Sequence, residues 1–193
     1  MIIGITGGTG CGKTTALEVI RELGGVVLDC DAIYHQLLKT DPALLSAIET
    51  RFPGVVENGQ LDRKKLGALV FADPEALKDL NAITHRAVYA AVEQALAQKP
   101  ELAAIDAIAL FESGLSGLCQ LTLGITAPVE VRVTRLMARD GITESYARSR
   151  IAAQKPEDWF RRHCDRVLVN DGTKAAFREK CLAFFRESGI IRA

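Results

Sequence analysis

Residues 7–14 combine glycines with a lysine and a threonine at a spacing suited to phosphate binding. They read Gly-Gly-Thr-Gly-Cys-Gly-Lys-Thr, which matches a glycine, any four residues, Gly-Lys, and then Ser or Thr. Such glycines let backbone N–H groups face phosphate oxygens, and the N-terminus of a following helix adds the positive end of its dipole. Lys13 would reach the β and γ phosphates, and the Thr14 hydroxyl would ligate Mg²⁺. The segment therefore predicts a nucleotide-binding loop.

The expected nucleotide contacts extend slightly beyond this pattern. A guanine-specific protein would carry Asn-Lys-x-Asp after a later strand, whereas residues 170–173 read Asn-Asp-Gly-Thr. Cys11 lies where the loop opens onto a helix N-terminus, which favours a lowered thiol pKa unless the side chain points away from solvent. We expect contacts to ATP from Thr6, Gly7, Gly8, Gly10, Cys11, Gly12, Lys13, Thr14 and Thr15.

Two acids follow the second apolar run of the chain, residues 26–28. Asp29 and Asp31 would lie where a strand leaves the sheet beside the phosphate loop. A carboxylate there can accept the proton of an attacking hydroxyl or orient that hydroxyl for in-line transfer. We favour Asp31 for this role, with Asp29 as the alternative catalyst or as a helix cap.

Several arginines recur on one side of a predicted helix. Arg132, Arg135 and Arg139 are spaced i, i+3 and i+7, and Arg148 and Arg150 follow after a glycine turn. Two such helices suit a lid that closes over a γ-phosphate, supplies charge and excludes water. The alternative is a pair of solvated helix faces on which the arginines have the neighbouring acids Glu130, Asp140 and Glu144 as partners.

The apolar pattern places these residues on alternating strands and helices. Short apolar runs at 2–6, 26–28, 103–111, 121–125 and 167–169 are expected as strands covered on both faces. Helices are expected over 14–23, 129–139 and 143–154, the last with Thr143 as N-cap, and a further helix closes the chain. Residues 32–96 read as a mainly helical insertion. This order indicates an α/β fold with a doubly wound parallel sheet.

The composition is that of an ordinary globular protein. Hydrophobic residues make up 48% and charged residues 25% of the 193, and basic and acidic residues balance at 24 each. No overall field would attract nucleic acid or an anionic membrane, so we expect small-molecule partners, no nucleic acid and no membrane. The five cysteines are odd in number and lack a Cys-x-x-Cys pair, which favours a reducing, cytoplasmic location. A monomer and a small homo-oligomer both fit.

Further motifs follow the loop in a definite order. Residues 28–31 read Leu-Asp-Cys-Asp, residues 59–63 read Gly-Gln-Leu-Asp-Arg and continue to Val70-Phe71, and residues 80–85 read Leu-Asn-Ala-Ile-Thr-His. Together with the segment at 4–14, this set resembles the dephospho-coenzyme A kinase family over nearly the whole chain. Later matches are Leu110-Phe111-Glu112, Arg135, Arg139, Gln154, Asp165, Asn170 and Gly172.

The resemblance implies transfer of the γ-phosphate of ATP, with Mg²⁺, to the ribose 3′-hydroxyl of dephospho-coenzyme A, the last step of coenzyme A biosynthesis. It implies a P-loop kinase core at about 1–31, 101–134 and 156–193, a helical acceptor subdomain at about 32–100 and an Arg-bearing lid at about 135–155. The implied roles are catalysis by Lys13, Asp31, Arg135 and Arg139, acceptor binding by Asp31, Arg63, His85 and Glu112, ATP binding that includes Asn170, and metal binding by Thr14.

The chain departs from the usual pattern of that family at several positions. Arg86 follows His85 where proline is usual, and the proline that usually precedes a Leu-Leu-Phe-Glu stretch is replaced, leaving Ile108-Ala109-Leu110-Phe111-Glu112. Cys11 replaces a common serine, and Arg132 replaces a usual glutamine. None of these changes removes a charge that phosphoryl transfer needs. They affect the expected backbone path near His85 and Glu112.

Several alternatives remain at this point. His85 could be a hydrogen-bonded structural histidine. Glu112 could act through Mg²⁺-bound water, and Asp106 ranks lower because it lies early in its expected strand. The chain could phosphorylate another small molecule, such as a nucleoside or nucleotide, or it could be a nucleotide-dependent regulatory protein without catalysis.

Overall fold

The computed structural model describes residues 1–190, and their contacts divide the chain into two compact units. One unit comprises Met1–Leu28 and the chain from Lys99 onwards, and the other comprises Asp29–Gln98. Asp29, the last residue of the second strand, and Asp31 therefore belong to the second unit. Among the described residues, no helix is both long and apolar enough to cross a membrane.

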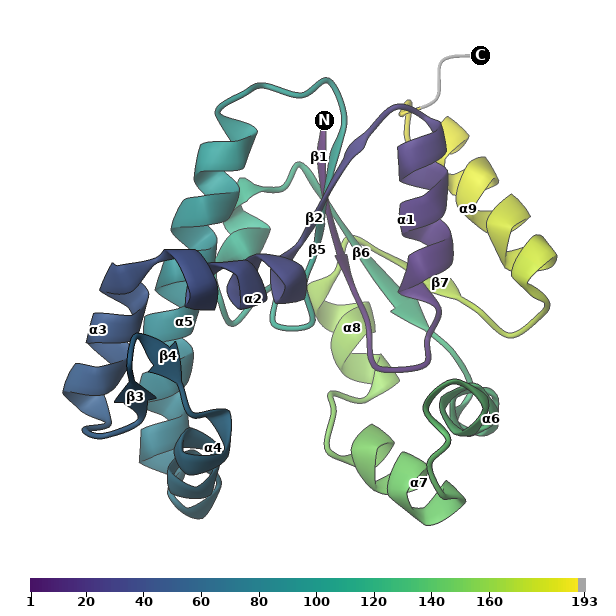
Figure 1. The fold of residues 1–193 in the computed structure, drawn as a ribbon. Coiled ribbons are helices and arrows are strands. Elements are labelled where there is room, and N and C mark those ends of the chain that lie inside the picture. The colour runs from purple at the N-terminus through teal and green to yellow at the C-terminus, as the bar shows by residue number, and fades with distance from the viewer. Residues whose placement is uncertain (191–193) are drawn as a thin grey trace. The chain divides into compact units, whose positions relative to one another are not determined.

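The first unit is built on a twisted sheet (Figure 1). Within residues 1–190, five strands form this sheet in the order β2-β5-β1-β6-β7. β1 pairs in parallel with β5 and β6, so that Ile3 lies opposite Ala104 and Leu121, and β6 pairs in parallel with β7. Parallel strands end at one edge of the sheet, and the loops that leave that edge are where α/β proteins bind ligands. The bounds are β1 (Ile2–Thr6), β2 (Val26–Asp29), β5 (Ala103–Asp106), β6 (Leu121–Thr126) and β7 (Arg166–Val169).

Helices cover both faces of this sheet. On one face, α1 and α9 pack on alternate strand residues such as Ile5 and Leu123, with Phe177 and Phe185 at the centre of the core. On the other face, Phe160 of α8 packs close to Gly124. The expected doubly wound α/β fold is therefore confirmed. The helices of this unit are α1 (Lys13–Glu22), η1 (Leu115–Leu118), α6 (Val129–Asp140), α7 (Glu144–Ala152), α8 (Glu157–His163) and α9 (Lys174–Glu187).

The second unit is a group of helices with a short hairpin. Its helices enclose a separate apolar core that includes Ile48, Phe52 and Val70. Asn58 and Gly59 have φ angles of 51° and 74° and form the two-residue turn of the hairpin, for which Asn-Gly is the favoured pair. The elements are α2 (Cys30–Thr40), α3 (Pro42–Arg51), β3 (Val56–Glu57), β4 (Gln60–Leu61), α4 (Arg63–Ala72) and α5 (Pro74–Leu96).

The structure corrects one predicted strand end and adds two elements. The strand expected over 103–111 ends at Asp106, because the chain turns there although apolar residues continue. Helix α8 lies in a stretch that the sequence left unassigned, and the hairpin interrupts an insertion expected to be mainly helical. The predicted N-cap is confirmed, since the Thr143 hydroxyl accepts the N–H of Tyr146.

Candidate active site

The phosphate loop runs from β1 to α1, and its carbonyl oxygens point towards the protein. The carbonyl of Gly7 accepts a hydrogen bond from Lys13 Nζ at 3.0 Å, and the carbonyl of Gly8 accepts one from the N–H of Cys11 at 3.3 Å. Within residues 1–190, the N–H groups of Gly12 and Lys13 donate to no hydrogen bond. These groups are left to bind an anion at the N-terminus of α1.

The next three carbonyls of the loop are held by side chains from distant parts of the chain. Arg132 Nε donates to the carbonyl of residue 9 at 2.8 Å, and Arg135 Nη1 donates to that of residue 10 at 3.3 Å. Asn170 Nδ2 donates to the carbonyl of Cys11 at 2.9 Å. The loop is therefore oriented from behind by α6 and by the segment after β7.

Asn170 packs against the loop so closely that only glycine fits at residue 12. Gly12 has a φ of 89°, and a Cβ there would lie 2.2 Å from Asn170 Nδ2. Asn170 is 3% exposed, and its Oδ1 accepts from Arg135 Nη2 at 3.0 Å. Both ends of its amide are thus engaged with protein atoms. Its expected contact with ATP remains a prediction, whereas its contact with the loop is direct.

An acid from the neighbouring strand lies beside the loop lysine. Asp106 is the last residue of β5, and its Oδ1 is 4.0 Å from Lys13 Nζ. The view that Asp106 lies too early in its strand was wrong, because the strand is shorter than its apolar run. Glu112 lies beyond the strand, where its carboxylate is 3.5 Å from Lys155 Nζ.

The threonines around the loop differ in exposure. Thr14, the second residue of α1, is exposed, whereas Thr6 and Thr15 are buried and Thr6 Oγ1 donates to the carbonyl of Ile108 at 3.2 Å. The Thr14 hydroxyl and the Asp106 carboxylate are hard oxygen donors of the kind that Mg²⁺ takes. Among residues 1–190 no group of three His, Cys, Asp or Glu side chains could hold a metal.

Cys11 does not have the environment that the sequence predicted. It is 2% exposed, and burial raises the pKa of its thiol, although the positive charges of Arg132 and Lys13 act in the opposite direction. The expectation of a lowered pKa was wrong because desolvation disfavours the thiolate more than these charges favour it.

We expect Cys11 to react slowly with alkylating reagents at pH 8. A raised pKa leaves the thiol protonated at that pH, and the protonated form is a poor nucleophile. Iodoacetamide labelling followed by peptide mapping should show Cys11 modified at least about tenfold more slowly than free cysteine. The Cys11→Ser variant identifies the labelled peptide, and labelling of Cys11 as fast as that of free cysteine contradicts the buried position.

The arginines of α6 and α7 fall into two groups. Arg132 and Arg135 contact the loop. The others pair with acids: Arg139 with Asp140 at 2.6 Å, Arg150 with Asp140 at 2.8 Å, and Arg148 with both Glu130 and Glu144. The hydrogen bond from Arg139 holds the pKa of Asp140 at about 2. The alternative of solvated, acid-paired helix faces therefore describes this second group.

Asp29 at the end of β2 and Asp31 at the start of α2 have different surroundings. Asp29 is the N-cap of α2, and its Oδ1 accepts the N–H of Ala32 at 2.9 Å. Asp31 lies in the first turn of the same helix and is exposed. Within the described part of the chain, its carboxylate makes no hydrogen bond or ion pair. Asp29 is therefore a helix cap, and Asp31 is left available for a ligand.

Arg63 meets a residue of α2 that the sequence did not single out. Its Nη2 lies 3.3 Å from His35 Nδ1, and burial raises the pKa of the adjacent Tyr34 while Arg63 acts against that shift. Asp62 caps α4 by accepting two backbone N–H groups, so it does not hold the Arg63 side chain. Arg63 borders a cavity of about 500 Å³ whose other lining residues are Leu38, Lys39, Asn58, Gly59, Gln60 and Leu61.

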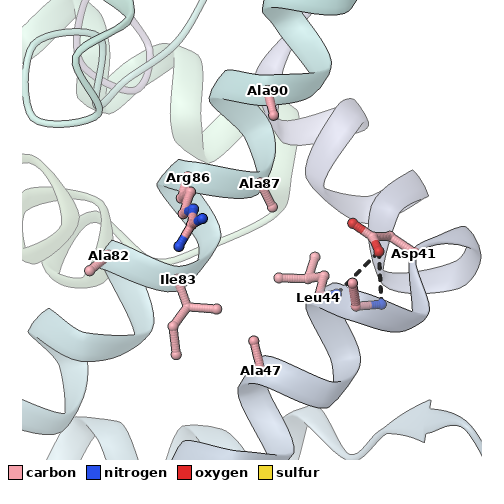
Figure 2. Close-up of a pocket in the computed structure, with 9 residues that line it drawn as sticks. Asp41, Leu44, Ala47, Ala82, Ile83, Arg86, Ala87 and Ala90 are labelled. Carbon is pink, nitrogen blue, oxygen red and sulfur yellow. Dashed lines mark hydrogen bonds between the residues drawn. The ribbon is translucent and has the colours of Figure 1, made fainter.

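A second cavity of about 590 Å³ lies in the same unit between α3 and α5. Figure 2 shows Ile83 and Ala87 of α5 facing Leu44 and Ala47 of α3 across it. Its lining is mostly apolar. His85 is on α5 and half-buried, but it lines neither this cavity nor the one beside Arg63.

Sequence reasoning missed or ranked low three residues with contacts at these sites. Asp106 was ranked low because the apolar run that contains it is longer than the strand that it ends. His35 lies four residues after Asp31, which places both on one side of α2, and that spacing was a usable signal. Gln154 was matched to a motif without a role, but its Oε1 accepts the N–H of Thr9 at 2.9 Å.

Comparison with known proteins gives one consistent family. A family model described as dephospho-CoA kinase matches residues 1–176. A dephospho-CoA kinase of Geobacillus kaustophilus is 37% identical over 196 residues, covering 97% of this chain and 96% of that protein. A crystal structure from Thermus thermophilus is similar with a TM-score of 0.80 and 37% identity, covering 97% of both chains. The dephospho-CoA kinase of Campylobacter jejuni is similar with a TM-score of 0.69 and 28% identity, covering 98% of both chains.

Proposed function

The chain belongs to the dephospho-CoA kinase family, and we propose that it transfers the γ-phosphoryl group of ATP to the ribose 3′-hydroxyl of dephospho-CoA, giving CoA and ADP. The observation that carries this proposal is the geometry of the phosphate loop. Its carbonyls accept hydrogen bonds from the side chains of Lys13, Arg132, Arg135 and Asn170. The N–H groups of Gly12 and Lys13, at the start of α1, have no hydrogen-bond partner within residues 1–190. ATP and dephospho-CoA are the proposed small-molecule partners. The free thiols of all five cysteines suit a reducing cytoplasm.

The loop and the helix that follows it would bind the triphosphate. Lys13 would contact the β and γ phosphates, and Thr14 with Asp106 would hold Mg²⁺, directly or through its waters. Mg²⁺ bound there would neutralise charge that develops on the phosphate oxygens. We propose Asp106 rather than Glu112 for this position, because Asp106 lies beside Lys13 whereas Glu112 pairs with Lys155.

The second unit would bind the acceptor. Arg63 and Lys39 give the cavity beside the hairpin a positive side that suits the phosphates of dephospho-CoA, and His35 lies next to Arg63. Asp31 lies on the same helix as His35, four residues earlier. An acceptor held by Arg63 and His35 would thus have a carboxylate on the same side of α2. Roles for His85 and Glu112 in acceptor binding remain predictions.

The transfer step needs a base, an oriented nucleophile and charge stabilisation. Asp31 would accept the proton of the 3′-hydroxyl while the hydroxyl oxygen forms its bond to the γ-phosphorus. The bond between that phosphorus and the bridging oxygen to the β-phosphate breaks, and ADP leaves. Lys13 would stabilise the transferring group, and Arg135 and Arg139 would add positive charge from the lid. Arg139 would have to exchange its partner Asp140 for a phosphate to do so.

Substituting Arg63 tests the acceptor site. The Arg63→Ala variant should raise KM for dephospho-CoA by at least about tenfold, because a charge-assisted hydrogen bond to phosphate is lost. KM for ATP should stay close to the wild-type value, and kcat should change little, since the bond is present both before and during the reaction. Steady-state kinetics in both substrates measures these constants.

Arg51→Ala is the matched control, since Arg51 lies in the same unit and pairs with the exposed Asp79. It should leave both KM values unchanged. His35→Ala should raise the acceptor KM in the same direction as Arg63→Ala. A rise in KM for ATP alone in the Arg63 variant would place the acceptor elsewhere.

A further inference from the structure

The peptide groups at Thr9 are held on both sides by two side chains, Arg132 and Gln154, that have no part in the proposed transfer step. Arg132 Nε donates to the Thr9 carbonyl at 2.8 Å, and the Thr9 N–H donates to Gln154 Oε1 at 2.9 Å. The same Oε1 accepts from Arg132 Nη2 at 2.7 Å. These three residues form a closed set of hydrogen bonds, which we call the Thr9 clamp.

The clamp joins the loop to both helices of the predicted lid. Arg132 lies in the first turns of α6, and Gln154 follows the end of α7, where its N–H donates to the carbonyl of Ile151 at 3.1 Å. The Thr9 clamp also packs against Gly8, because a Cβ added to Gly8 would lie 2.4 Å from Arg132 Nη2 and 2.8 Å from Gln154 Oε1. A displacement of either helix would therefore be transmitted to residues 8 and 9 of the loop.

Arg132 brings a positive charge that forms no ion pair within the described part of the chain. The residue is 8% exposed, and no acid within residues 1–190 lies at ion-pair distance from it, unlike Arg139, Arg148 and Arg150. A buried charge without a counter-charge is costly. Its field reaches the loop, because it acts to lower the pKa of the Cys11 thiol. The triphosphate of a bound nucleotide would supply the missing negative charge.

We propose that Arg132 and Gln154 are positioning residues that fix the phosphate loop and link it to the lid, and that Arg132 also contributes positive charge to nucleotide binding. The proposal deepens the proposed function and rests on it for the identity of the nucleotide. It separates two effects. The charge of Arg132 acts on nucleotide affinity, whereas the geometry of the clamp acts on the transfer step.

Nucleotide affinity measured without acceptor tests the charge. Arg132→Met keeps the volume but removes charge and donors, so calorimetry should show ATP binding with Mg²⁺ weakened by about tenfold or more. Arg132→Lys keeps the charge without the two-pronged geometry, so it should bind ATP within about threefold of wild type while kcat falls by about tenfold or more. Gln154→Met should also lower kcat with ATP affinity nearly retained. Arg161→Ala, which removes an exposed arginine paired with Glu157 on α8, should change neither constant.

A thermal melt checks that each variant folds. If Arg132→Met does not fold, Arg132→Lys and Gln154→Met still test the proposal. ATP binding at wild-type strength in Arg132→Met overturns the charge assignment. Wild-type kcat in both Arg132→Lys and Gln154→Met overturns the positioning role. Because the calorimetric measurement needs no acceptor, its result stands even if dephospho-CoA is not phosphorylated, so failure of this proposal is distinguishable from failure of the proposed function.

Discussion

Replacing Lys13 by methionine is expected to lower kcat by about a thousandfold or more while the fold is retained. Lys13 is the one loop residue whose side-chain cation would meet the transferring phosphoryl group. Its Nζ is held between the Gly7 carbonyl at 3.0 Å and Asp106 at 4.0 Å, so the charge is placed before the nucleotide arrives. Methionine keeps most of the side-chain volume and removes the charge.

Lys174→Met is the matched control for this substitution. Lys174 lies at the start of α9, where its Nζ pairs with exposed Glu18 at 2.8 Å, so its loss should leave kcat unchanged. ADP release in a coupled assay gives kcat, and circular dichroism checks the fold. A Lys13→Met enzyme that keeps a tenth or more of wild-type turnover contradicts the assignment of Lys13.

Replacing Asp31 by asparagine is the second change with a large expected effect. Asparagine keeps the shape and hydrogen-bonding capacity of the side chain but cannot take a proton from the acceptor hydroxyl. General-base catalysis contributes about 10²–10⁴-fold, so kcat should fall by about a hundredfold or more. ATP affinity measured by calorimetry should be nearly unchanged, because Asp31 is not part of the phosphate loop.

Asp29→Asn is a close control for this variant. Asp29 caps α2, and asparagine is as good an N-cap as aspartate, so the helix and the activity should both survive. If Asp29→Asn loses turnover and Asp31→Asn keeps it, the two acids must exchange roles.

The sequence predicted the order of strands and helices well because the physical signals are local. Parallel strands covered on both faces appear as short apolar runs, and the glycines of the phosphate loop mark the turn between β1 and α1. The same signal failed after β5, where Asp106 ends the strand although apolar residues continue, and Asp106 was ranked below Glu112 as a result.

Which contacts the side chains make could not be predicted from spacing. Arg132, Arg135 and Arg139 share one side of α6, but only tertiary packing decides that the first two meet the loop while Arg139 meets Asp140. Residues far apart in the chain meet in the second unit as well, since His35 and Arg63 are in contact although they are 28 positions apart. The pKa of the Cys11 thiol depends on how deeply the side chain is buried, and the sequence of a glycine-rich loop does not reveal that burial.

The most direct test of the account is ADP release by the wild-type protein with ATP, Mg²⁺ and a panel of hydroxyl acceptors. The panel should contain dephospho-CoA, adenosine, AMP and shikimate, and phosphorus NMR of the product should locate the new phosphate. We expect kcat/KM for dephospho-CoA to exceed that for every other acceptor by about a hundredfold or more, with the phosphate on the ribose 3′-oxygen. Faster phosphorylation of another acceptor, or ADP release that no acceptor stimulates, would contradict the assignment.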